Sequence, residues 1–499
     1  MPFGTANQFN PACPIIFMFI YTIPILLAAA FLIPVLSLKI PKAAPFAAVA
    51  GIGAAFLVVV LSASPILEGQ IYKFYMASWV PPIGIAIAVD GLSLLMALIA
   101  TGLGLAAAVF SYRYISHRKP EYYTVLLLMA AGMVGISITG DLFNLYVFFE
   151  IMSAASYILV AWTRTKEALE GAIKYLIINA FATSLILLGI AFMYGLTGTL
   201  NMADIALKVQ PSIVLATSVG LMVTGFAIKS ALFPLHFWLA DAHPAAPSPM
   251  SALLSGAVVN IGLYSMLRLA FITSPVLDFY LIMLVLGALS MAAAGFMSVL
   301  QKDIKRLLAY STISQIGYCF FAIGLGTSLG ITAGLFHMLN HAIMKGLLFF
   351  CAGAVIYSTG IRNMNEMGGL AKRMPLVTAC FGIGALAIAG IPPFNGFASK
   401  YLIYLAAWEI NPLLAVFAIV IAGVTLAYYL KAFSGMFLGP ESPGLQIQKI
   451  PMSMLVPILA LTILCVIIGI FPEAGLSLAQ AAAASLLNLP DYISTVLGT

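Results

Sequence analysis

The chain has very little charge for its size. Of its 499 residues only 8% are Asp, Glu, Lys or Arg, while 63% are hydrophobic; an average soluble domain carries about 25% charged residues. Apolar runs of about 20 residues, each long enough to cross a bilayer as a helix, recur along the whole length. These features exclude an ordinary soluble enzyme and indicate an all-α, polytopic membrane protein. The net charge of +6 is not a nucleic-acid signal, because the basic residues lie in short loops.

Cysteine is also scarce, with five residues and no CxxC pair. Four of the five lie well inside apolar runs, which is typical of small buried hydrophobic residues. The sequence contains no P-loop and no GxGxxG after a predicted strand. It therefore predicts no cofactor, no metal ion and no nucleotide site in this chain.

The apolar runs predict fourteen membrane spans. The seventh and twelfth are long and interrupted, the seventh at Pro234 and the twelfth at Pro392–Pro393 and Gly396. The predicted ranges are 12–38, 43–64, 84–115, 122–140, 142–163, 167–195, 210–241, 249–272, 276–299, 305–325, 329–359, 375–408, 411–437 and 452–472. An alanine-rich tail of mildly amphipathic helical character, 473–499, follows the last span.

The loop charges support this number of spans. Loops after even-numbered spans carry only Lys73 and Lys208, with Arg268 at a span end. The cations in loops after odd-numbered spans are Lys39, Lys42, Arg113, Arg118, Lys119, Arg164, Lys166, Lys302, Lys305, Arg306, Arg362, Lys372, Arg373 and Lys449. By the positive-inside rule the odd-numbered loops lie in the cytoplasm and both termini lie outside.

Two similar pentapeptides indicate an internal repeat. GFAIK at 225–229 and GFASK at 396–400 each lie at a predicted helix break. The two spans are five apart, so the copies run in opposite directions, as in inverted repeats whose broken helices form ion sites. We therefore expect two five-helix units, spans 4–8 and 9–13. The corresponding regions are N-terminal helices 1–120, a first repeat 121–272, a second repeat 273–440, and a C-terminal span and tail 441–499.

Charged residues inside the spans are the candidate functional groups, because a charge at the bilayer centre costs about 2.5–3.5 kcal/mol and usually marks an ion path. Glu150 follows Asp141 on the fifth span, roughly 13 Å into the membrane by helical rise. With Lys229 it is predicted to form a buried pair that holds or releases a proton as its neighbours change. A static ion pair that only fixes helix packing is the alternative.

The eleventh span carries a stripe of titratable residues. His337, His341 and Lys345 fall at i, i+4 and i+8 and so share one helical face. Histidine titrates near neutrality, which suits a proton relay between the two halves. Zinc binding is less favoured, because no third ligand is evident and the lysine disfavours a cation. A stripe of histidines that only pack is the other alternative.

Three residues are candidates for proton uptake from the cytoplasm: Lys174 on the sixth span, and His236 and His243 around the cytoplasmic end of the seventh. Lys174 either guides protons towards Glu150 or extends to the membrane interface. The two histidines either pass protons on or cap and pack the helix.

Other polar residues are assigned structural roles. Asp90, at the start of the third span, is interpreted as structural, and Lys305 as a cytoplasmic anchor. Ser311 and Gln315 on the tenth span either join helices by hydrogen bonds or hold water, and the first role is favoured.

Several of these segments resemble the antiporter-type subunits shared by respiratory complex I, Mrp-type multisubunit Na+/H+ antiporters and energy-converting membrane-bound hydrogenases. The segments are FFEIMSAASYILV, KSALFPLHFWLADAHPAAPSPMSALL, QKDIKRLLAYSTISQIGY, FHMLNHAIMKGLLFF and GIPPFNGFASK. The resemblance covers nearly all of residues 85–435. Chain length favours the Mrp D-type and hydrogenase branches.

The resemblance implies a proton-translocating subunit of a multisubunit complex in the cell membrane of a prokaryote. Its partners would be homologous antiporter-like and small membrane subunits, which would supply the energy by cation exchange or by a redox reaction. Glu150, Lys229 and Lys400 would be the central proton-handling groups, with His337 and His341 between the halves. The embedded groups are mostly nitrogens, which favours H+, while Na+ stays open.

One position departs from this family. Asn260 stands on the eighth span where many members carry a lysine. Asparagine cannot carry a proton as a charge but can order a water molecule, so either the histidines and water bridge the halves or the path is altered. Two other classes stay open: a free-standing secondary transporter of small solutes, and a structural membrane subunit without its own ion path.

Overall fold

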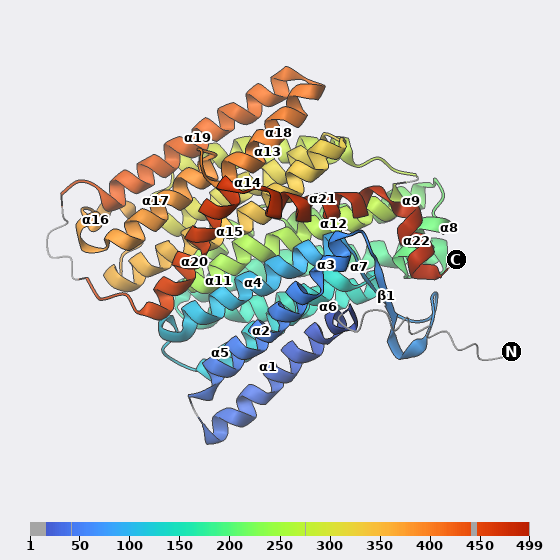
Figure 1. Ribbon diagram of the computed structural model, residues 1–499, viewed down its shortest axis with the longest axis horizontal. Coiled ribbons are helices and arrows are strands. Elements are labelled where there is room, and N and C mark those ends of the chain that lie inside the picture. Colours follow the sequence, from blue (N-terminus) through green and yellow to red (C-terminus); the bar gives the residue numbers. More distant parts are fainter. Residues whose placement is uncertain (1–15, 41, 275, 441–446, 499) are drawn as a thin grey trace.

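The computed structural model describes residues 16–40, 42–274, 276–440 and 447–498, and most of them are helical. Figure 1 shows long helices running side by side in one bundle. The N-terminal elements are η1 (Ile16–Tyr21), α1 (Thr22–Lys39), α2 (Ala43–Leu61), α3 (Ala63–Leu67), β1 (Tyr72–Tyr75), η2 (Met76–Ser78), β2 (Ala86–Val89) and α4 (Gly91–Tyr114).

Two groups of helices follow. The first group is α5 (Lys119–Ile138), α6 (Leu142–Val160), η3 (Ala161–Thr163), α7 (Lys166–Thr197), α8 (Met202–Lys208), α9 (Ile213–Lys229), α10 (Phe237–Ala245), α11 (Ser248–Leu253), the π-helical η4 (Leu254–Val258) and α12 (Val259–Thr273). The second is α13 (Tyr280–Val299), α14 (Ile304–Gly324), α15 (Ser328–Thr359), η5 (Met364–Glu366), α16 (Leu370–Arg373), α17 (Pro375–Ala389), α18 (Asn395–Ile410) and α19 (Pro412–Phe437). The C-terminal helices are α20 (Met452–Ile470), α21 (Glu473–Leu487) and α22 (Leu489–Leu497).

Twelve helices in the described part of the chain are long and apolar enough to cross a membrane. Two shorter apolar helices, α9 and α17, accompany them. Both fall where the sequence predicts an interrupted span: residues 230–236 separate α9 from α10, and residues 390–394 separate α17 from α18. The predicted breaks are thus confirmed, while the number fourteen stays a prediction. The start of the first predicted span (12–38) and residues 441–446 lie outside the described residues.

The third predicted span, 84–115, begins too early. Residues 86–89 form the buried strand β2, which pairs antiparallel with β1, with Tyr72 opposite Val89. The helix begins only after Asp90, whose carboxylate accepts a hydrogen bond from Ser93 N at 3.0 Å and so caps α4. A short buried strand and a buried helix have the same apolar composition, so the sequence pattern does not separate them.

Helices α7 and α15 are built alike at both ends. Each has 32 residues, and their first residues, 166 and 328, are separated by 162 positions. Each follows a threonine, Thr165 or Thr327, whose hydroxyl accepts a hydrogen bond from a backbone N–H of the first turn. Each ends at a glycine in the left-handed conformation, Gly198 or Gly360, where a side chain would be strained.

Two isolated antiparallel bridges repeat the same spacing. One bridge joins Asp141 to Asn201, and the other joins Asp303 to Asn363. Each residue of the second bridge lies 162 positions after its counterpart in the first. Each aspartate also caps the helix after it, α6 or α14. The two halves of the chain therefore share one local plan, which is what two related five-helix units require.

The two similar pentapeptides do not occupy equivalent places in this plan. Lys229 is the last residue of α9, before the first break. Lys400 is the sixth residue of α18, after the second break. Their match therefore reflects similar composition beside a break and does not follow the spacing of 162 residues that the caps and bridges share.

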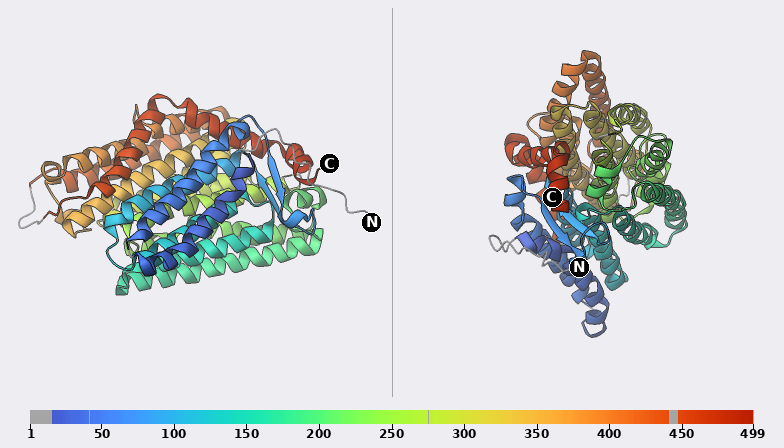
Figure 2. Two further views of the ribbon diagram at one scale, coloured as in Figure 1. Left: turned by 60° about the horizontal axis from the view of Figure 1, so that its bottom comes forward. Right: turned by 90° about the vertical axis from the view of Figure 1, so that its right-hand side faces the viewer.

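The C-terminal helices hold the bundle together from one side. Figure 1 shows α21 lying across the bundle, and it packs on both α4 and α15. A side chain at Gly91 would place its Cβ 2.5 Å from the carbonyl of Ala481, so glycine permits this contact. The hydroxyl of Tyr75 donates to Val496 O at 2.6 Å, which joins β1 to α22. The end-on view in Figure 2 shows α1 and α19 at opposite extremes of the bundle.

A buried ion pair lies beside this contact. Arg268 on α12 is 2% exposed and donates from Nη1 to Asp90 Oδ2 at 2.6 Å, and Nη2 pairs with Oδ1. The guanidinium also lies over the rings of Tyr264 and Tyr492. The structural role predicted for Asp90 fits this pair. Arg268 lies near the end of its span, as predicted, and its partner Asp90, at the start of α4, is far away in the sequence.

Candidate functional site

Lys174 lies in an ion-pair network on the surface. Its Nζ is 2.8 Å from Glu170 Oε1 and 3.1 Å from Asp241 Oδ2, and its side chain is 48% exposed. Asp241 also meets Arg306 at 3.4 Å, so the network joins α7, α10 and α14. Exposed pairs of this kind contribute about 0–1 kcal/mol each. Lys174 is thus paired with two carboxylates, and neither of them is Glu150.

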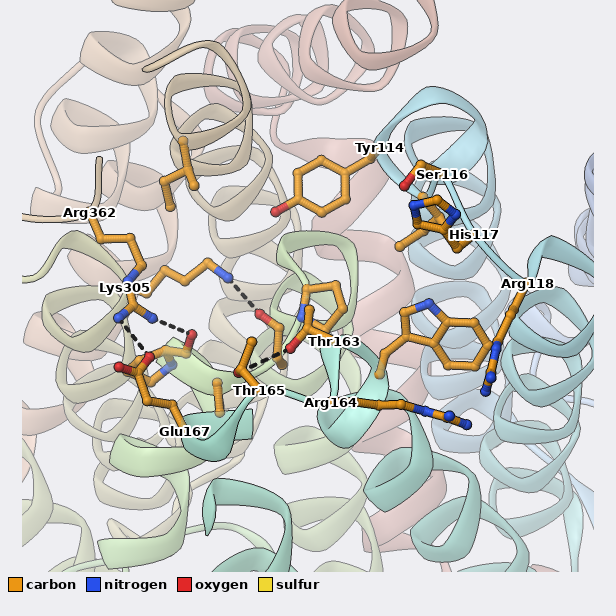
Figure 3. A pocket seen from close by; sticks show the side chains of 17 residues that line it. Tyr114, Ser116, His117, Arg118, Thr163, Arg164, Thr165, Glu167, Lys305 and Arg362 are labelled. Carbon is orange, nitrogen blue, oxygen red and sulfur yellow. Dashed lines mark hydrogen bonds and ion pairs between the residues drawn. The ribbon is translucent and has the colours of Figure 1, made fainter. Parts of the chain in front are cut away.

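A cavity of about 580 Å³ opens beside this network (Figure 3). Figure 3 shows Lys305 and Arg362 on one side of it, and His117, Arg118 and Arg164 on the other. We call this region, with its basic side chains, the basic end of the bundle. It brings together loops that the charge pattern assigns to a single membrane face.

Lys305 is not the exposed anchor that the sequence predicts. It is 3% exposed, and its Nζ donates to Ala246 O at 2.6 Å. Arg362 Nη1 donates to Pro244 O at 3.0 Å. Both carbonyls lie at the C-terminal end of α10, where the helix dipole favours cations. The reason for the error is that α10 packs on the start of α14 and covers Lys305.

The two histidines predicted for proton uptake are buried near the first helix break. His243 on α10 stacks on Phe349 of α15, with ring centroids 4.6 Å apart. Neither ring nitrogen of His243 has a hydrogen-bond partner among the described residues, and the same holds for Nδ1 of His236. Buried polar atoms of this kind are normally satisfied by internal water. These ring nitrogens are therefore candidate binding sites for internal water.

Lys229 does not form the predicted ion pair with Glu150. It is 2% exposed and donates from Nζ to Ser153 Oγ at 2.8 Å. The nitrogen also lies over the ring of Phe149, 5.5 Å from the centroid. The pairing prediction was wrong because Ser153, one turn further along α6, faces α9, whereas Glu150 is partly exposed and its Oε1 has no partner among the described residues.

Lys400 is fully buried and binds the end of the broken helix. Its Nζ donates to Ile388 O at 2.9 Å and lies 4.5 Å from the centre of the Tyr318 ring. Ile388 belongs to the last turn of α17, whose carbonyls have no partner within the helix. The helix dipole stabilises a cation there, so the second break supplies a site for an ammonium without any carboxylate.

His337, His341 and Lys345 are all buried on α15. His337 lies between Ser399 Oγ, 3.0 Å from Nδ1, and Gln315 Oε1, 3.2 Å from Nε2. Both ring nitrogens of His341 lack a hydrogen-bond partner in the described part of the chain. The three side chains thus have different surroundings, although their spacing along the helix is regular.

Lys345 is held by groups from two other helices. Its Nζ donates to Leu308 O at 3.0 Å and to the Tyr429 hydroxyl at 3.2 Å. Tyr429 in turn lies 2.9 Å from Ser311 Oγ. None of these partners carries a negative charge, so Lys345, like Lys229 and Lys400, is a buried amine whose hydrogen-bond partners are neutral.

Asn260 is buried on α12, just after the π-helical stretch η4. Its Nδ2 donates to Gly256 O at 2.7 Å, while Oδ1 has no partner among the described residues. The amide oxygen is therefore free to bind water. A π-helical turn often accompanies a functional site, because it rotates one helix face relative to the next turn.

Sequence reasoning missed several polar partners of the buried lysines. It assigns no role to Ser153, Tyr428 and Tyr429, and it favours helix joining for Ser311 and Gln315. Adjacent tyrosines in the middle of an apolar span are the available signal, because a buried tyrosine hydroxyl needs a partner. Ser153 follows Glu150 at i+3, which is a second available signal.

Comparisons with known proteins identify the family and the fold of the chain. Residues 139–425 match the family described as "NADH:quinone oxidoreductase/Mrp antiporter, TM", and residues 79–124 match "NADH-Ubiquinone oxidoreductase (complex I), chain 5 N-terminus". The N subunit of the NADH-quinone oxidoreductase of Desulforudis audaxviator is 36% identical over 467 residues, covering 88% of this chain and 93% of the relative. The D-type Na+/H+ antiporter subunit of Alkalihalophilus pseudofirmus is 35% identical over 455 residues, covering 88% and 91%. One chain of the Mrp complex from Dietzia sp. DQ12-45-1b superposes with a TM-score of 0.91 at 29% identity, covering 97% of this chain and 99% of that one.

Proposed function

Because the chain belongs to the NADH:quinone oxidoreductase/Mrp antiporter membrane family, we propose that it moves protons as one subunit of a multisubunit ion-pumping complex. The predicted resemblance is confirmed by these relatives, and the chain is a multi-pass membrane protein. Neighbouring antiporter-like and small membrane subunits supply the energy, either by cation/H+ exchange or by a redox reaction. The transported ion is H+, with Na+ as a second ion in an exchange complex.

The observation that carries this proposal is a set of three buried amines without counter-charges. Lys229, Lys345 and Lys400 donate hydrogen bonds to hydroxyl or carbonyl oxygens of the described residues. A hydroxyl or carbonyl accepts a hydrogen bond from an ammonium and from a neutral amine alike. Intramembrane ionisable residues without a purely structural partner mark ion paths. Each lysine can therefore hold and release a proton without breaking an ion pair.

The proposed route begins at the basic end. Protons enter past Lys174 and the buried histidines His236 and His243, and load Lys229. They then pass along α15, by way of His341, Lys345 and His337, to Lys400, and leave on the opposite face. The nitrogens of His243 and His341 and the oxygen of Asn260, which lack partners among the described residues, support this order, because water bound to them would close the gaps.

Glu150 is the proposed trigger. Its side chain is partly exposed on α6, while its Oε1 is buried without a partner among the described residues, and an unpaired carboxylate inside the membrane is costly. A neighbouring membrane subunit that covers this face would therefore set its charge. When Glu150 is ionised, it favours the protonated form of Lys229; when it is neutralised, Lys229 releases its proton towards α15.

Orientation and repeat structure belong to the same proposal. The basic end faces the cytoplasm of a prokaryotic cell, and both termini face outward across the plasma membrane. The four regions are 1–120, 121–272, 273–440 and 441–499, and the two central ones are inverted repeats of fourteen spans in all. The shared spacing of 162 residues supports the repeat, and an odd number of spans between equivalent helices makes it inverted.

The test uses the assembled complex in sealed vesicles. Lys229→Ala and Glu150→Gln are each compared with the wild type for ion-driven or redox-driven proton movement. Lys208→Ala is the matched control, because Lys208 forms an exposed pair with Asp204. We expect both test variants to assemble and to lose most proton transport, and the control to keep it. Full transport in either test variant, with normal assembly, would remove the basis of the proposal.

A further inference from the structure

A chain of hydroxyl groups leads away from Lys345. The Lys345 Nζ donates to the Tyr429 hydroxyl at 3.2 Å, and that hydroxyl lies 2.9 Å from Ser311 Oγ. The Tyr428 hydroxyl lies 2.9 Å from the same serine oxygen. All four side chains are fully buried, in α15, α14 and α19. They form a continuous line, because each donor–acceptor distance along it is within the usual range for a hydrogen bond.

The far end of this line approaches His337. Gln315 lies one turn beyond Ser311 on α14, and its Oε1 is 3.2 Å from His337 Nε2. Because an amide oxygen can only accept, this contact places the proton of neutral His337 on Nε2. His337 Nδ1 is then the acceptor for the Ser399 hydroxyl at 3.0 Å. Ser399 directly precedes Lys400 in α18, so the far end of the line lies one residue from the lysine of the second helix break.

The alternative connection along α15 itself is not hydrogen-bonded. His341 lies between Lys345 and His337 on the helix, but both of its ring nitrogens lack partners among the described residues. A regular i, i+4 spacing therefore does not produce a continuous path here. The hydroxyl line runs around His341, along the faces of α14 and α19.

We propose that Tyr429, Ser311 and Tyr428 form a proton relay from Lys345 towards Lys400, and that Gln315 positions His337 at its far end. This inference rests on the proposed function. The relay residues come from α14, which packs on α15, and from α19, which packs on α14.

The transfer leaves no charge on the relay. One N–H bond of the Lys345 ammonium breaks and an O–H bond forms on Tyr429, whose own proton moves to Ser311. The Tyr428 hydroxyl, which donates to Ser311 in the structure, first turns away from it. The Ser311 proton then moves to Tyr428, and the Tyr428 proton moves to a water molecule beside Gln315. Neutral Lys400 takes the excess proton from water, while Lys345 is left neutral. The hydroxyls then rotate back, since each acts as donor or acceptor.

The experiment measures proton transport by the assembled complex in sealed vesicles. Tyr429→Phe, Tyr428→Phe and Ser311→Ala each remove one hydroxyl, and Ser311→Thr keeps it. Tyr123→Phe is the matched control, because Tyr123 is fully buried and its hydroxyl donates to a backbone carbonyl, Ala108 O, at 3.1 Å. We expect each of the three deletions to lower the transport rate by about tenfold or more. Ser311→Thr and the Tyr123 control should stay near the wild-type rate.

Tyr428→Phe and the serine pair separate a relay from a supporting role. Of the two tyrosines, only Tyr429 forms a hydrogen bond with Lys345 in the described structure. If the tyrosines served only to hold this lysine, the loss of the Tyr428 hydroxyl would therefore have no effect on transport. Wild-type transport in Tyr428→Phe, or equal loss in Ser311→Ala and Ser311→Thr after normal assembly, would overturn the relay. Lys229→Ala, measured in the same preparation, keeps the two proposals apart. If it abolishes transport while the hydroxyl variants do not, the relay fails and the proposed function stands.

Discussion

Replacing Asp90 by Asn should destabilise the protein by about 3–5 kcal/mol, because it leaves the charge of Arg268 buried without a partner. Asp90 is fully buried and Arg268 is 2% exposed. Both carboxylate oxygens bind the guanidinium, and Ser93 Oγ accepts a further bond from Nη2 at 3.0 Å. An asparagine keeps an oxygen for the cap on Ser93 N but not the negative charge.

Further variants separate the contributions of the helix cap and of the ion pair to this loss of stability. Asp90→Ala also removes the helix cap, which adds about 1 kcal/mol. Arg268→Met leaves Asp90 as the unpaired charge and should cost a similar amount to Asp90→Asn. The double variant, Asp90→Asn with Arg268→Met, should be less destabilised than the sum of the two by about 1–3 kcal/mol, because no lone charge is left in it.

The assay is thermal unfolding of the full-length protein in detergent. The fraction that stays folded after heating is measured as the height of the monodisperse peak in size-exclusion chromatography. Lys208→Ala, which breaks an exposed pair, is the control and should change stability by less than about 0.5 kcal/mol. If Asp90→Asn and this control have the same melting temperature, the ion pair contributes nothing to stability and the reasoning from burial is wrong. The same conclusion follows if the single effects simply add in the double variant.

Three further predictions concern the lysines and the second break. Lys400→Arg should assemble normally but lose at least about tenfold in proton transport, because arginine does not give up its proton; wild-type transport would show that only charge matters there. Ser153→Ala should slow transport and destabilise by about 1–3 kcal/mol through the unsatisfied Lys229 amine, whereas Ser153→Thr should restore both, and its failure to do so would argue against the hydroxyl. Gly396→Ala should destabilise by about 3 kcal/mol, because its Cβ would collide with the backbone oxygen of Ala387; an unchanged melting temperature would contradict this contact.

Membrane class, the approximate helices and both breaks could be predicted from sequence because each depends on local composition. A run of apolar residues long enough to span a bilayer becomes a helix, because its backbone must be hydrogen-bonded internally. Proline interrupts the hydrogen bonds of such a helix. The strand pair β1–β2 was missed because its second strand is short and continues directly into an apolar helix.

The sequence also shows which charged residues lie within the spans, but it does not show which groups they bind. The sequence pairs Lys229 with Glu150, whereas in the structure Lys229 binds Ser153. It predicts Lys305 as a cytoplasmic anchor without a partner, whereas in the structure Lys305 binds the carbonyl of Ala246. A hydrogen-bond partner depends on how each helix is rotated about its axis, and that rotation is decided by packing between helices far apart in the sequence. Spacing along one helix contains no information about it.

The predicted internal repeat also depends partly on local sequence and partly on tertiary structure. Two similar pentapeptides point to a repeat, yet they place Lys229 before one break and Lys400 after the other. The sequence by itself determined that two interrupted helices each carry a lysine inside the membrane. Only the tertiary structure decided which carbonyl or hydroxyl each lysine binds. It also showed that the buried line from Lys345 runs through tyrosines of α19, because those contacts exist only once α14, α15 and α19 are packed together.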